Sequence, residues 1–433
     1  MNVTDPTAAP TPPAPAFPPV KRREIFGWCC FDFANSSFTT IIITVVYAVY
    51  FTQVVAAGDA RAAGWWGTAL AVSQLGAILI GPLLGAVADA TARKKAFLLV
   101  SAVVCSLGTA ALAFVGPGEI ALALGLVIVA NLAFSLSENL CSAFLPEIST
   151  PENAGRISGY GWSFGYCGGL LSLVLALVML QVLDWPATWT FLMTGVFFFG
   201  ASLPTQFLLR ERARPRPLAP GETYARLAFA QLGEMRRELP RHRTLAVFFG
   251  AMTVFLAGLS AVVAFAAVFA TQALGMTQAE IIQLFIVLQI AGVAGALGFG
   301  HLQDKIGAKV ALVGSLALWI LVCVWAWACR GKTEFFLVGI LAGVAMGSLQ
   351  SAGRAVVATL TPAGRSGEFF GYWGFFGKLA GIVGPLVFGW VATATDVRQA
   401  ILLNAGFFLA GLLVLLPLSL KPGAGRGPRT DTL

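Results

Sequence analysis

The sequence predicts an all-α membrane protein with twelve transmembrane helices, arranged as two pseudo-symmetric bundles of six. Three observations lead to this prediction: the composition, twelve apolar runs of membrane-spanning length, and an internal repeat. Of the 433 residues, 58% are hydrophobic and 11% are charged, whereas a soluble domain is about a quarter charged. A soluble fold would leave much of this apolar surface in contact with water. Lipid is therefore the solvent that fits the chain.

The apolar runs set the organisation of the chain. A helix needs about 20 apolar residues to cross the hydrocarbon layer. Twelve runs of about that length lie near 27–55, 64–88, 96–115, 120–144, 157–182, 188–209, 244–272, 278–300, 309–329, 334–358, 367–393 and 399–420. They predict a disordered tail at 1–23, a first bundle at 24–209, a linker at 210–243, a second bundle at 244–420 and a second tail at 421–433. The first tail is rich in Pro, Ala and Thr and does not have the pattern of a cleavable signal peptide.

The distribution of Lys and Arg predicts the orientation. With the N-terminus inside, the outer connectors hold only four basic residues, namely Arg61, Arg330, Lys332 and Arg398. The inner side holds Lys21, Arg22, Arg23, Arg93, Lys94, Lys95, Arg156, the basic residues of 210–243, Lys305, Lys309, Arg354, Arg365, Lys421, Arg426 and Arg429. Because cytoplasmic connectors retain Lys and Arg, we expect a multi-pass protein of the cell (inner or plasma) membrane with both termini cytoplasmic. The net charge of +8 lies in these connectors, which argues against nucleic acid as a partner.

The longest connector, 210–243, contains nine Arg. Its part 222–239 could form an amphipathic helix on the membrane surface or a solvated linker.

The two halves of the sequence repeat each other. Asp89 follows the second run and Asp304 follows the eighth, 215 residues later, and each is followed by basic residues. A second echo has a constant offset of 212: Gly159-Tyr160, Phe164-Gly165 and Gly169 match Gly371-Tyr372, Phe376-Gly377 and Gly381. Both copies of this echo follow a Thr-Pro and a Gly-Arg pair. A parallel repeat of six helices is typical of one large class of transporters.

The repeated connector resembles the hallmark of the major facilitator superfamily, Gly-x-x-x-Asp-(Arg/Lys)-x-Gly-(Arg/Lys)-(Arg/Lys). The second copy, Gly300 through Lys309, fits it closely. The first copy keeps Asp89, but Ala90 and Ala92 stand where a base and a Gly are usual. The resemblance implies the major facilitator fold, with two halves that rock about a central site.

A narrower resemblance covers nearly the whole chain outside the tails. Gly27-Trp28 followed by Phe31-Asp32-Phe33-Ala34-Asn35-Ser36 is similar to the Gly-Trp-x-x-Tyr-Asp-x-Ala-Asn-Ser opening of the autophagy-related vacuolar effluxer branch and its bacterial relatives, with Phe31 in place of Tyr. The segments from Leu145-Pro146-Glu147 to Gly165 and from Gly364-Arg365 to Lys378 are also similar to that branch. This resemblance implies the efflux of amino acids.

Ionisable groups inside the apolar runs are the candidates for a substrate or proton site, because a charge in hydrocarbon is costly. Glu138 shares one helical face with Asn131, Ser135 and Ser142, so it is expected to face a cavity or to form a structural ion pair.

Asp32 lies near the start of the first run, on one face with Asn35 and Ser36, where helix capping is the alternative. Lys378 could pair with either carboxylate or extend to the membrane surface. A further polar patch late in the tenth run comprises Gln350, Ser351 and Arg354. The superfamily resemblance implies that the central cavity is surrounded by Asn35, Glu138, Ser260 and Gln350.

A second group of charges is expected to act in gating. It comprises Asp89, Arg93, Asp304, Lys305 and Arg354, which lie towards the cytoplasmic ends of the runs. The resemblance implies that the two aspartates close the inward gate by pairing with nearby bases and helix N-termini. The alternative is that the bases only set the topology.

These features favour a secondary active transporter of a small polar solute, such as an amino acid, that works by alternating access. No phosphate-binding Gly-x-x-x-x-Gly-Lys-(Ser/Thr) motif, nucleophile–base set or metal-ligand spacing occurs in the sequence. We therefore expect neither an enzyme nor a cofactor or a bound metal.

The expected partners are the solute, the lipid bilayer and a coupling ion. The hypothesis for this ion is a proton, carried by Glu138 as the first choice and by Asp32 as the second. The protein is expected to be a monomer. A sugar or drug exporter and a non-transporting scaffold or sensor remain alternatives.

Overall fold

The computed structural model describes residues 19–59, 61–215 and 242–420, with a few isolated positions between 223 and 230. Within this part of the chain, twelve helices are long and apolar enough to cross a membrane, which confirms the predicted number of spans. The segment 222–239, predicted as an amphipathic helix or a solvated linker, lies almost entirely outside the described residues. The exact boundaries of tails, bundles and linker stay a prediction.

The N-terminal half contains six spans. The first begins as α1 (Arg22–Phe38) and continues through π-helical turns and the short α2 (Tyr47–Tyr50) to Val55. The others are α3 (Ala62–Thr91), α4 (Lys94–Ala111), α5 (Ile120–Ser142) with the short α6 (Leu145–Ile148), α7 (Ala154–Leu177) and α8 (Thr188–Leu208). The C-terminal half contains α10 (Arg243–Leu274), α11 (Gln278–Ile306), α12 (Ala308–Ala328), α13 (Lys332–Leu360), α14 (Ser366–Ala394) and α15 (Val397–Leu415).

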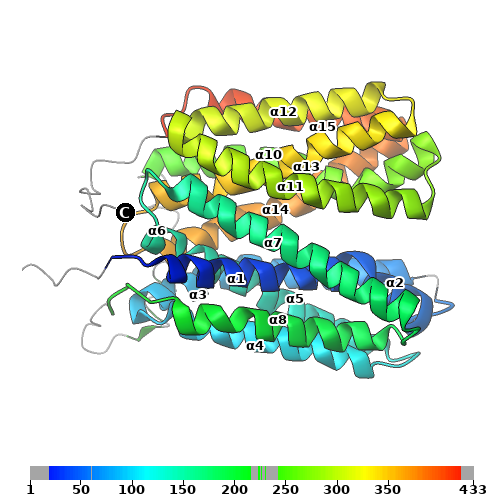
Figure 1. The fold of residues 1–433 in the computed structure, drawn as a ribbon, viewed down its shortest axis with the longest axis horizontal. Helices are drawn as coiled ribbons and strands as arrows, with labels where there is room; N and C mark the ends of the chain where they lie inside the picture. Colours follow the sequence, from blue (N-terminus) through cyan, green and yellow to red (C-terminus); the bar gives the residue numbers. More distant parts are fainter. Residues whose placement is uncertain are drawn as a thin grey trace, which may run out of the picture.

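The packing of the helices repeats between the halves (Figure 1). In the N-terminal half, α1 packs against α7 and α8, α5 against α3 and α4, and α4 against α8. In the C-terminal half, α10 packs against α14 and α15, α13 against α11 and α12, and α12 against α15. Across the interface, α3 packs against α14 and α11 packs against α7. Exchanging the halves maps each pair onto its counterpart, which confirms two pseudo-symmetric bundles.

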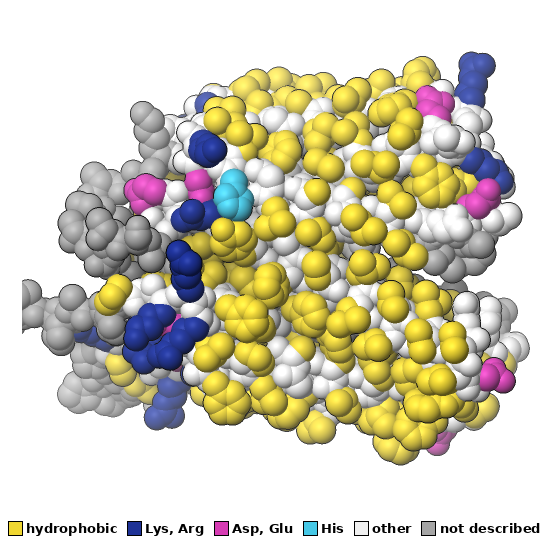
Figure 2. All heavy atoms as spheres, viewed as in Figure 1, with side chains coloured by type: hydrophobic (Ala, Val, Ile, Leu, Met, Phe, Trp, Pro, Cys, Tyr) yellow, Lys and Arg dark blue, Asp and Glu magenta, His cyan; other side chains and the backbone are white. Residues whose placement is uncertain are grey.

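The surface agrees with a molecule solvated by lipid. Figure 2 shows apolar side chains covering the middle of the molecule, with charged side chains gathered at its two ends. We call the end at which α1 begins the basic end. The alternation of the helices brings there the connectors that carry Arg93, Lys95, Arg156, Arg210, Arg212, Lys305, Lys309 and Arg365. The opposite end carries Arg61, Arg330, Lys332 and Arg398.

The two repeated connectors at the basic end differ in one backbone position. Gly307, at the end of α11, has φ 90° and ψ 151°, a conformation that suits Gly alone. Its counterpart after α3 is Ala92, which adopts the left-handed region with φ 51° and ψ 44°. A residue with a Cβ is disfavoured there by about 1–2 kcal/mol. The departure from the hallmark at Ala92 therefore keeps the turn but strains it.

This difference predicts opposite effects for two exchanges. Gly307→Ala should lower the free energy of unfolding by about 1–3 kcal/mol, because Ala cannot adopt this backbone without strain. Ala92→Gly should raise it by at most about 1 kcal/mol, because the relieved strain is partly offset by the more flexible unfolded chain. Denaturant titrations of the purified variants in detergent measure both, and equal signs would contradict the strain at Ala92.

Candidate functional site

A cavity of about 180 Å³ lies between the two halves. The C-terminal half supplies most of its wall: Met252, Phe255, Leu256, Leu259 and Ser260 from α10, Leu349, Gln350, Gly353 and Arg354 from α13, and Trp373, Gly374, Gly377 and Lys378 from α14. The N-terminal half supplies Glu138 and Asn139 from α5 and Trp162 from α7. The α10 wall is apolar except for Ser260, whereas charged and amide groups face the cavity from α5, α13 and α14.

One ion pair crosses this cavity. The Nζ atom of Lys378 lies 3.6 Å from Oε2 of Glu138, so the two charges attract each other without a close hydrogen bond. The side chains are 17% and 23% exposed, respectively, which leaves both accessible to a solute in the cavity. Of the two pairings predicted for Lys378, the structure contains the one with Glu138.

The pseudo-symmetric counterpart of this pair is neutral. Gln350 and Tyr166 lie 212 residues from Glu138 and Lys378, which is the offset of the sequence repeat. The Tyr166 hydroxyl donates a hydrogen bond of 2.7 Å to Oε1 of Gln350. Both pairs join the two halves, so the same scaffold carries an ionic contact on one side and a neutral one on the other. The cavity is therefore electrically asymmetric.

Arg354 forms a second ion pair across the halves. Its Nη1 donates to Oδ2 of Asp32 at 2.7 Å, linking α13 to α1. Its Nε and Nη2 donate to Oγ and the carbonyl oxygen of Ser158 on α7, at 3.2 Å and 3.0 Å. The guanidinium also lies over the rings of Trp28 and Trp162, 4.7 Å and 5.2 Å from their centroids. With a side chain 2% exposed, Arg354 is fixed on several sides.

The two predicted gate aspartates lie on helix N-termini of the opposite half. The carboxylate of Asp89 accepts hydrogen bonds of 3.0 Å from the backbone N–H groups of Gly367 and Glu368, at the start of α14. The carboxylate of Asp304 accepts bonds of 3.0 Å and 3.1 Å from the N–H groups of Gly155 and Arg156, at the start of α7. A helix N-terminus offers free N–H donors and a partial positive charge.

Close approach of the backbones makes the Asp89 contact possible. A Cβ atom placed on Gly85 would collide with the carbonyl oxygen of Gly367. Gly85 lies one turn before Asp89 on α3, so the absence of a side chain there lets the carboxylate reach the start of α14.

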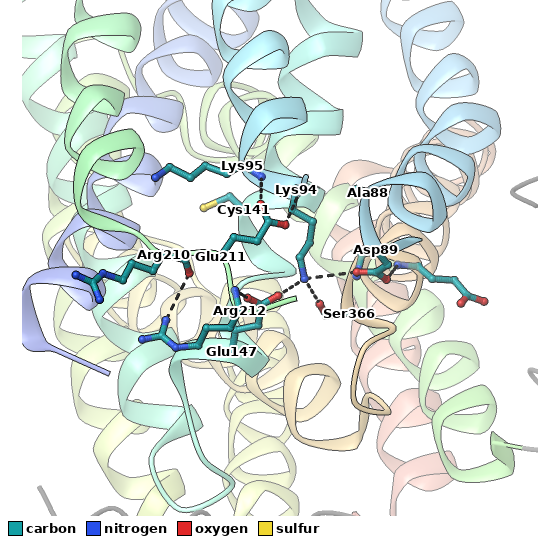
Figure 3. A network of polar contacts seen from close by, with 12 residues as sticks. Ala88, Asp89, Lys94, Lys95, Cys141, Glu147, Arg210, Glu211, Arg212 and Ser366 are labelled. Carbon is teal, nitrogen blue, oxygen red and sulfur yellow. Dashed lines mark hydrogen bonds and ion pairs between the residues drawn. The ribbon is translucent and has the colours of Figure 1, made fainter. Parts of the chain in front are cut away.

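A buried charge network surrounds the Asp89 contact (Figure 3). The Nζ atom of Lys94 forms an ion pair with Glu147, donates to Oγ of Ser366 at 2.7 Å, and lies 3.4 Å from Oδ1 of Asp89. The side chain of Lys94 is 2% exposed. Because Ser366 begins α14, Lys94 also joins the two halves.

The residues that follow α8 extend this network. The carboxylate of Glu211 accepts from the backbone N–H groups of Lys94 and Lys95, at 2.7 Å and 3.2 Å, at the start of α4. Burial raises the pKa of the Glu211 carboxyl, against the opposing effect of these N–H groups. The N–H of Arg212 donates to Glu147 at 3.0 Å, and its guanidinium lies 2.8 Å from the Glu24 carboxylate. The first residues of the linker are thus bound to the same carboxylate as Lys94.

The other predicted site residues lie elsewhere. Arg93 and Lys305 are exposed at the basic end, and the buried contacts beside Asp89 come from Lys94. Asn131 donates to Oγ of Ser73 at 2.6 Å inside the N-terminal half. Asn35 is buried, and neither it nor Asn131 lines the cavity. The roles of all these residues stay predictions.

Sequence reasoning missed several residues that the structure brings to the site. Trp28, Trp162 and Ser158 contact Arg354, and Glu147 and Arg212 contact the Lys94 network. Glu147 directly follows a Pro at the end of the fourth run, so an acidic residue at a span end was a usable signal for it. Trp28, Ser158 and Trp162 fall in the segments that resemble the effluxer branch, but apolar spacing alone does not separate them from ordinary packing residues.

The arrangement fits binding and conformational change. Charges from one half are held by N–H groups, hydroxyls or opposite charges of the other half, and these contacts close the basic end. The cavity offers hydrogen-bonding and charged groups above an apolar wall, which suits a small solute with polar and apolar parts.

Lys94 and its repeat counterpart Lys309 form a matched pair for a stability test. Lys94→Ala should cost about 3–5 kcal/mol of unfolding free energy, because it leaves Glu147 and Asp89 buried without their cation. Lys309 donates to the carbonyl oxygen of Leu416 in an exposed position, so Lys309→Ala should change the unfolding free energy by less than about 0.5 kcal/mol. Denaturant titration in detergent measures both changes. Equal costs would show that the buried network contributes nothing beyond a surface contact.

Comparisons with known proteins show which family the chain resembles. The family described as "Vacuole effluxer Atg22 like" matches residues 67–426. The chain is similar to the uncharacterized MFS-type transporter YxiO of Bacillus subtilis, with 25% identity over 90% of this chain and 93% of the relative. It is also similar to autophagy-related protein 22-1 of Penicillium rubens, with 26% identity over 63% of this chain. That fungal relative is matched over 50% of its own length.

Solved structures show the same fold. The human organic anion transporter MFSD10 matches with a TM-score of 0.73 and 17% identity, covering 91% of this chain and 99% of that one. A bacterial homologue of the iron transporter ferroportin in its outward-facing state matches with a TM-score of 0.71 and 14% identity, covering 92% and 99%. The family and the fold are those of transporters, so the protein is a multi-pass membrane transporter and not an enzyme. The chain belongs to the Atg22-like effluxer family, within the major facilitator superfamily.

Proposed function

We propose that the protein is a secondary active transporter that moves a small polar solute, such as an amino acid, by proton-coupled efflux. The observation that carries this proposal is the loose ion pair between Glu138 and Lys378, which bridges the two halves and faces the cavity. A solute with opposite charges can engage both partners. The description of the family as an effluxer supports efflux as the direction of transport.

Alternating access gives the contacts at the basic end their role. Asp89 and Asp304 hold the N-termini of α14 and α7 while that end is closed. These groups lie at the ends of spans, where water can replace each hydrogen bond once the halves separate. Opening therefore exchanges protein contacts for hydration instead of leaving carboxylates without partners. The bilayer-embedded remainder of each half moves as a unit.

Glu138 is the proposed proton carrier, and Asp32 is the second choice. A proton on Glu138 removes the negative charge that attracts Lys378 across the cavity, so it weakens one contact between the halves. Asp32 is held closely by Arg354 and Ser158 lies beside that pair, whereas Glu138 is accessible from the cavity.

The orientation and assembly are part of the proposal. We place the basic end and both termini in the cytoplasm, because Lys and Arg are retained there. The protein then lies in the cell membrane as a monomer. The alternative of a drug exporter with several substrates draws support from the apolar α10 wall formed by Met252, Phe255, Leu256 and Leu259.

Flux measurements with Glu138→Gln test the coupling. In proteoliposomes with an imposed pH gradient, the wild type should transport radiolabelled amino acids faster than without the gradient. Glu138→Gln should lose this acceleration, because Gln cannot carry the proton. Glu280→Gln is the matched control: its carboxylate pairs with Lys332 at the opposite end, within one half. Full, pH-dependent transport by Glu138→Gln would contradict the assignment, and accumulation of sugars or drugs in place of amino acids would favour the alternative exporter.

A further inference from the structure

Arg354 belongs to two structures at once. It forms part of the cavity wall. It also binds Asp32 and Ser158 of the other half. Its guanidinium has five N–H donors and keeps its charge at every accessible pH. The ion pair with Asp32 and the hydrogen bonds to Ser158 use three of these donors.

Two further donors lie beside Arg354 in the cavity wall. The indole Nε1 of Trp162 is buried and has no hydrogen-bond partner among the described residues, and the Trp162 ring stacks on the guanidinium. Gln350 lies four residues before Arg354, on the same face of α13. Its carbonyl oxygen accepts from Tyr166, so the group that it can offer a ligand is its amide N–H₂.

Acceptors gather on the other side of the cavity. Glu138 and the neighbouring Asn139 come from α5, and Oδ1 of Asn139 is buried without a hydrogen-bond partner among the described residues. Lys378 is engaged by Glu138. The wall formed by α7 and α13 therefore presents donors and a permanent cation, and the wall formed by α5 presents acceptors. Such polarity orients a ligand whose oxygen-rich anionic end faces α13.

Separation of the halves leaves the Arg354 guanidinium without its counter-ion. Arg354 moves with α13, whereas Asp32 and Ser158 belong to the N-terminal half. When the basic end opens, the guanidinium loses its counter-ion, and both rings beside it, Trp28 on α1 and Trp162 on α7, stay with the N-terminal half. A cation left in the protein interior without a partner is strongly destabilising. Asp32 can be neutralised by a proton, but Arg354 can only be satisfied by another anion.

We propose that the cavity binds a carboxylate group of the cargo at Arg354, with the Gln350 amide of the same helix as an additional donor and the Trp162 indole as a third donor while the halves are together, and that this carboxylate replaces Asp32 as the counter-ion when they separate. The inference rests on the proposed function and deepens it, because it names the charge that the cargo must carry and the residue that binds this charge. Arg354 then links occupancy of the cavity to release of the basic end.

The competition between the two carboxylates gives a signature that a structural ion pair lacks. Removing Arg354 should abolish binding of the ligand carboxylate. Removing the charge of Asp32 should strengthen it, because the competitor is gone. A close charge pair has a coupling energy at or above the value that corresponds to a tenfold change in affinity, so Asp32→Asn should lower the Kd by about tenfold.

The experiment uses the purified full chain in lipid nanodiscs and isothermal titration with paired probes. Phenylacetate and isobutyrate carry the carboxylate, and phenylacetamide and isobutyramide are their neutral analogues. The wild type should bind the two carboxylates at least about tenfold more tightly than the amides. Asp32→Asn should bind the carboxylates more tightly still, Arg354→Lys more weakly, and Arg354→Gln not measurably. Glu280→Gln, which breaks an ion pair outside the cavity, should behave as the wild type.

Three results would overturn the inference. One is equal binding of carboxylates and amides by the wild type. Another is a weakening of carboxylate binding in Asp32→Asn, which is the sign expected of a purely structural pair. The third is the absence of carboxylate binding in both the wild type and Asp32→Asn, which does not depend on whether the Arg354 variants fold. Because these titrations need no flux, the expected pattern in a protein that fails to transport would support the anion site and overturn the proposed function alone.

Discussion

The rest of the structure depends on carboxylates of one half that bind the N-terminal N–H groups of a helix in the other half. Asp89 on the start of α14 and Asp304 on the start of α7 are the two copies of this contact. Each copy combines a full charge with a partial one, and water can replace either side without leaving a buried charge. The contact can therefore be strong while the basic end is closed and still be reversible, which is what a moving interface needs.

The repeat supplies a symmetric scaffold, and the charges make it directional. The two-fold relates the pair of Glu138 and Lys378 to the neutral pair of Gln350 and Tyr166. It also relates the buried Lys94, which contacts α3, α6 and α14, to the half-buried Lys309, whose hydrogen bond to Leu416 lies in an exposed position. A cavity with identical halves would bind its cargo in two equivalent orientations. The unequal charges select one orientation and confine the charge-dependent contacts to α5, α13 and α14.

Much of the architecture could be predicted from the sequence because hydrophobicity and repetition are one-dimensional signals. The twelve spans and the two gate aspartates follow from run lengths and from an offset that recurs along the chain. The ion pairs do not, because pairing depends on which helix faces are opposed. Lys378 had two possible partners until α14 was placed against α5. Arg354 was expected to act in gating, but its position between Trp28, Trp162 and Asp32 required three helices to meet. Asn131 lies on the same polar face as Glu138, but its amide donates to Ser73 within one bundle and does not reach the cavity.

The central claim is that the two halves exchange contacts at the basic end for contacts at the opposite end. Distances between spin labels measure this directly, with one pair at the exposed Arg93 and Lys305 and the other at the exposed Arg61 and Arg330. Each pair joins the two halves. When cargo and a proton gradient are supplied, the first distance should lengthen and the second should shorten in the same molecules. Parallel changes at both ends, or active transport with neither distance changing, would contradict the account.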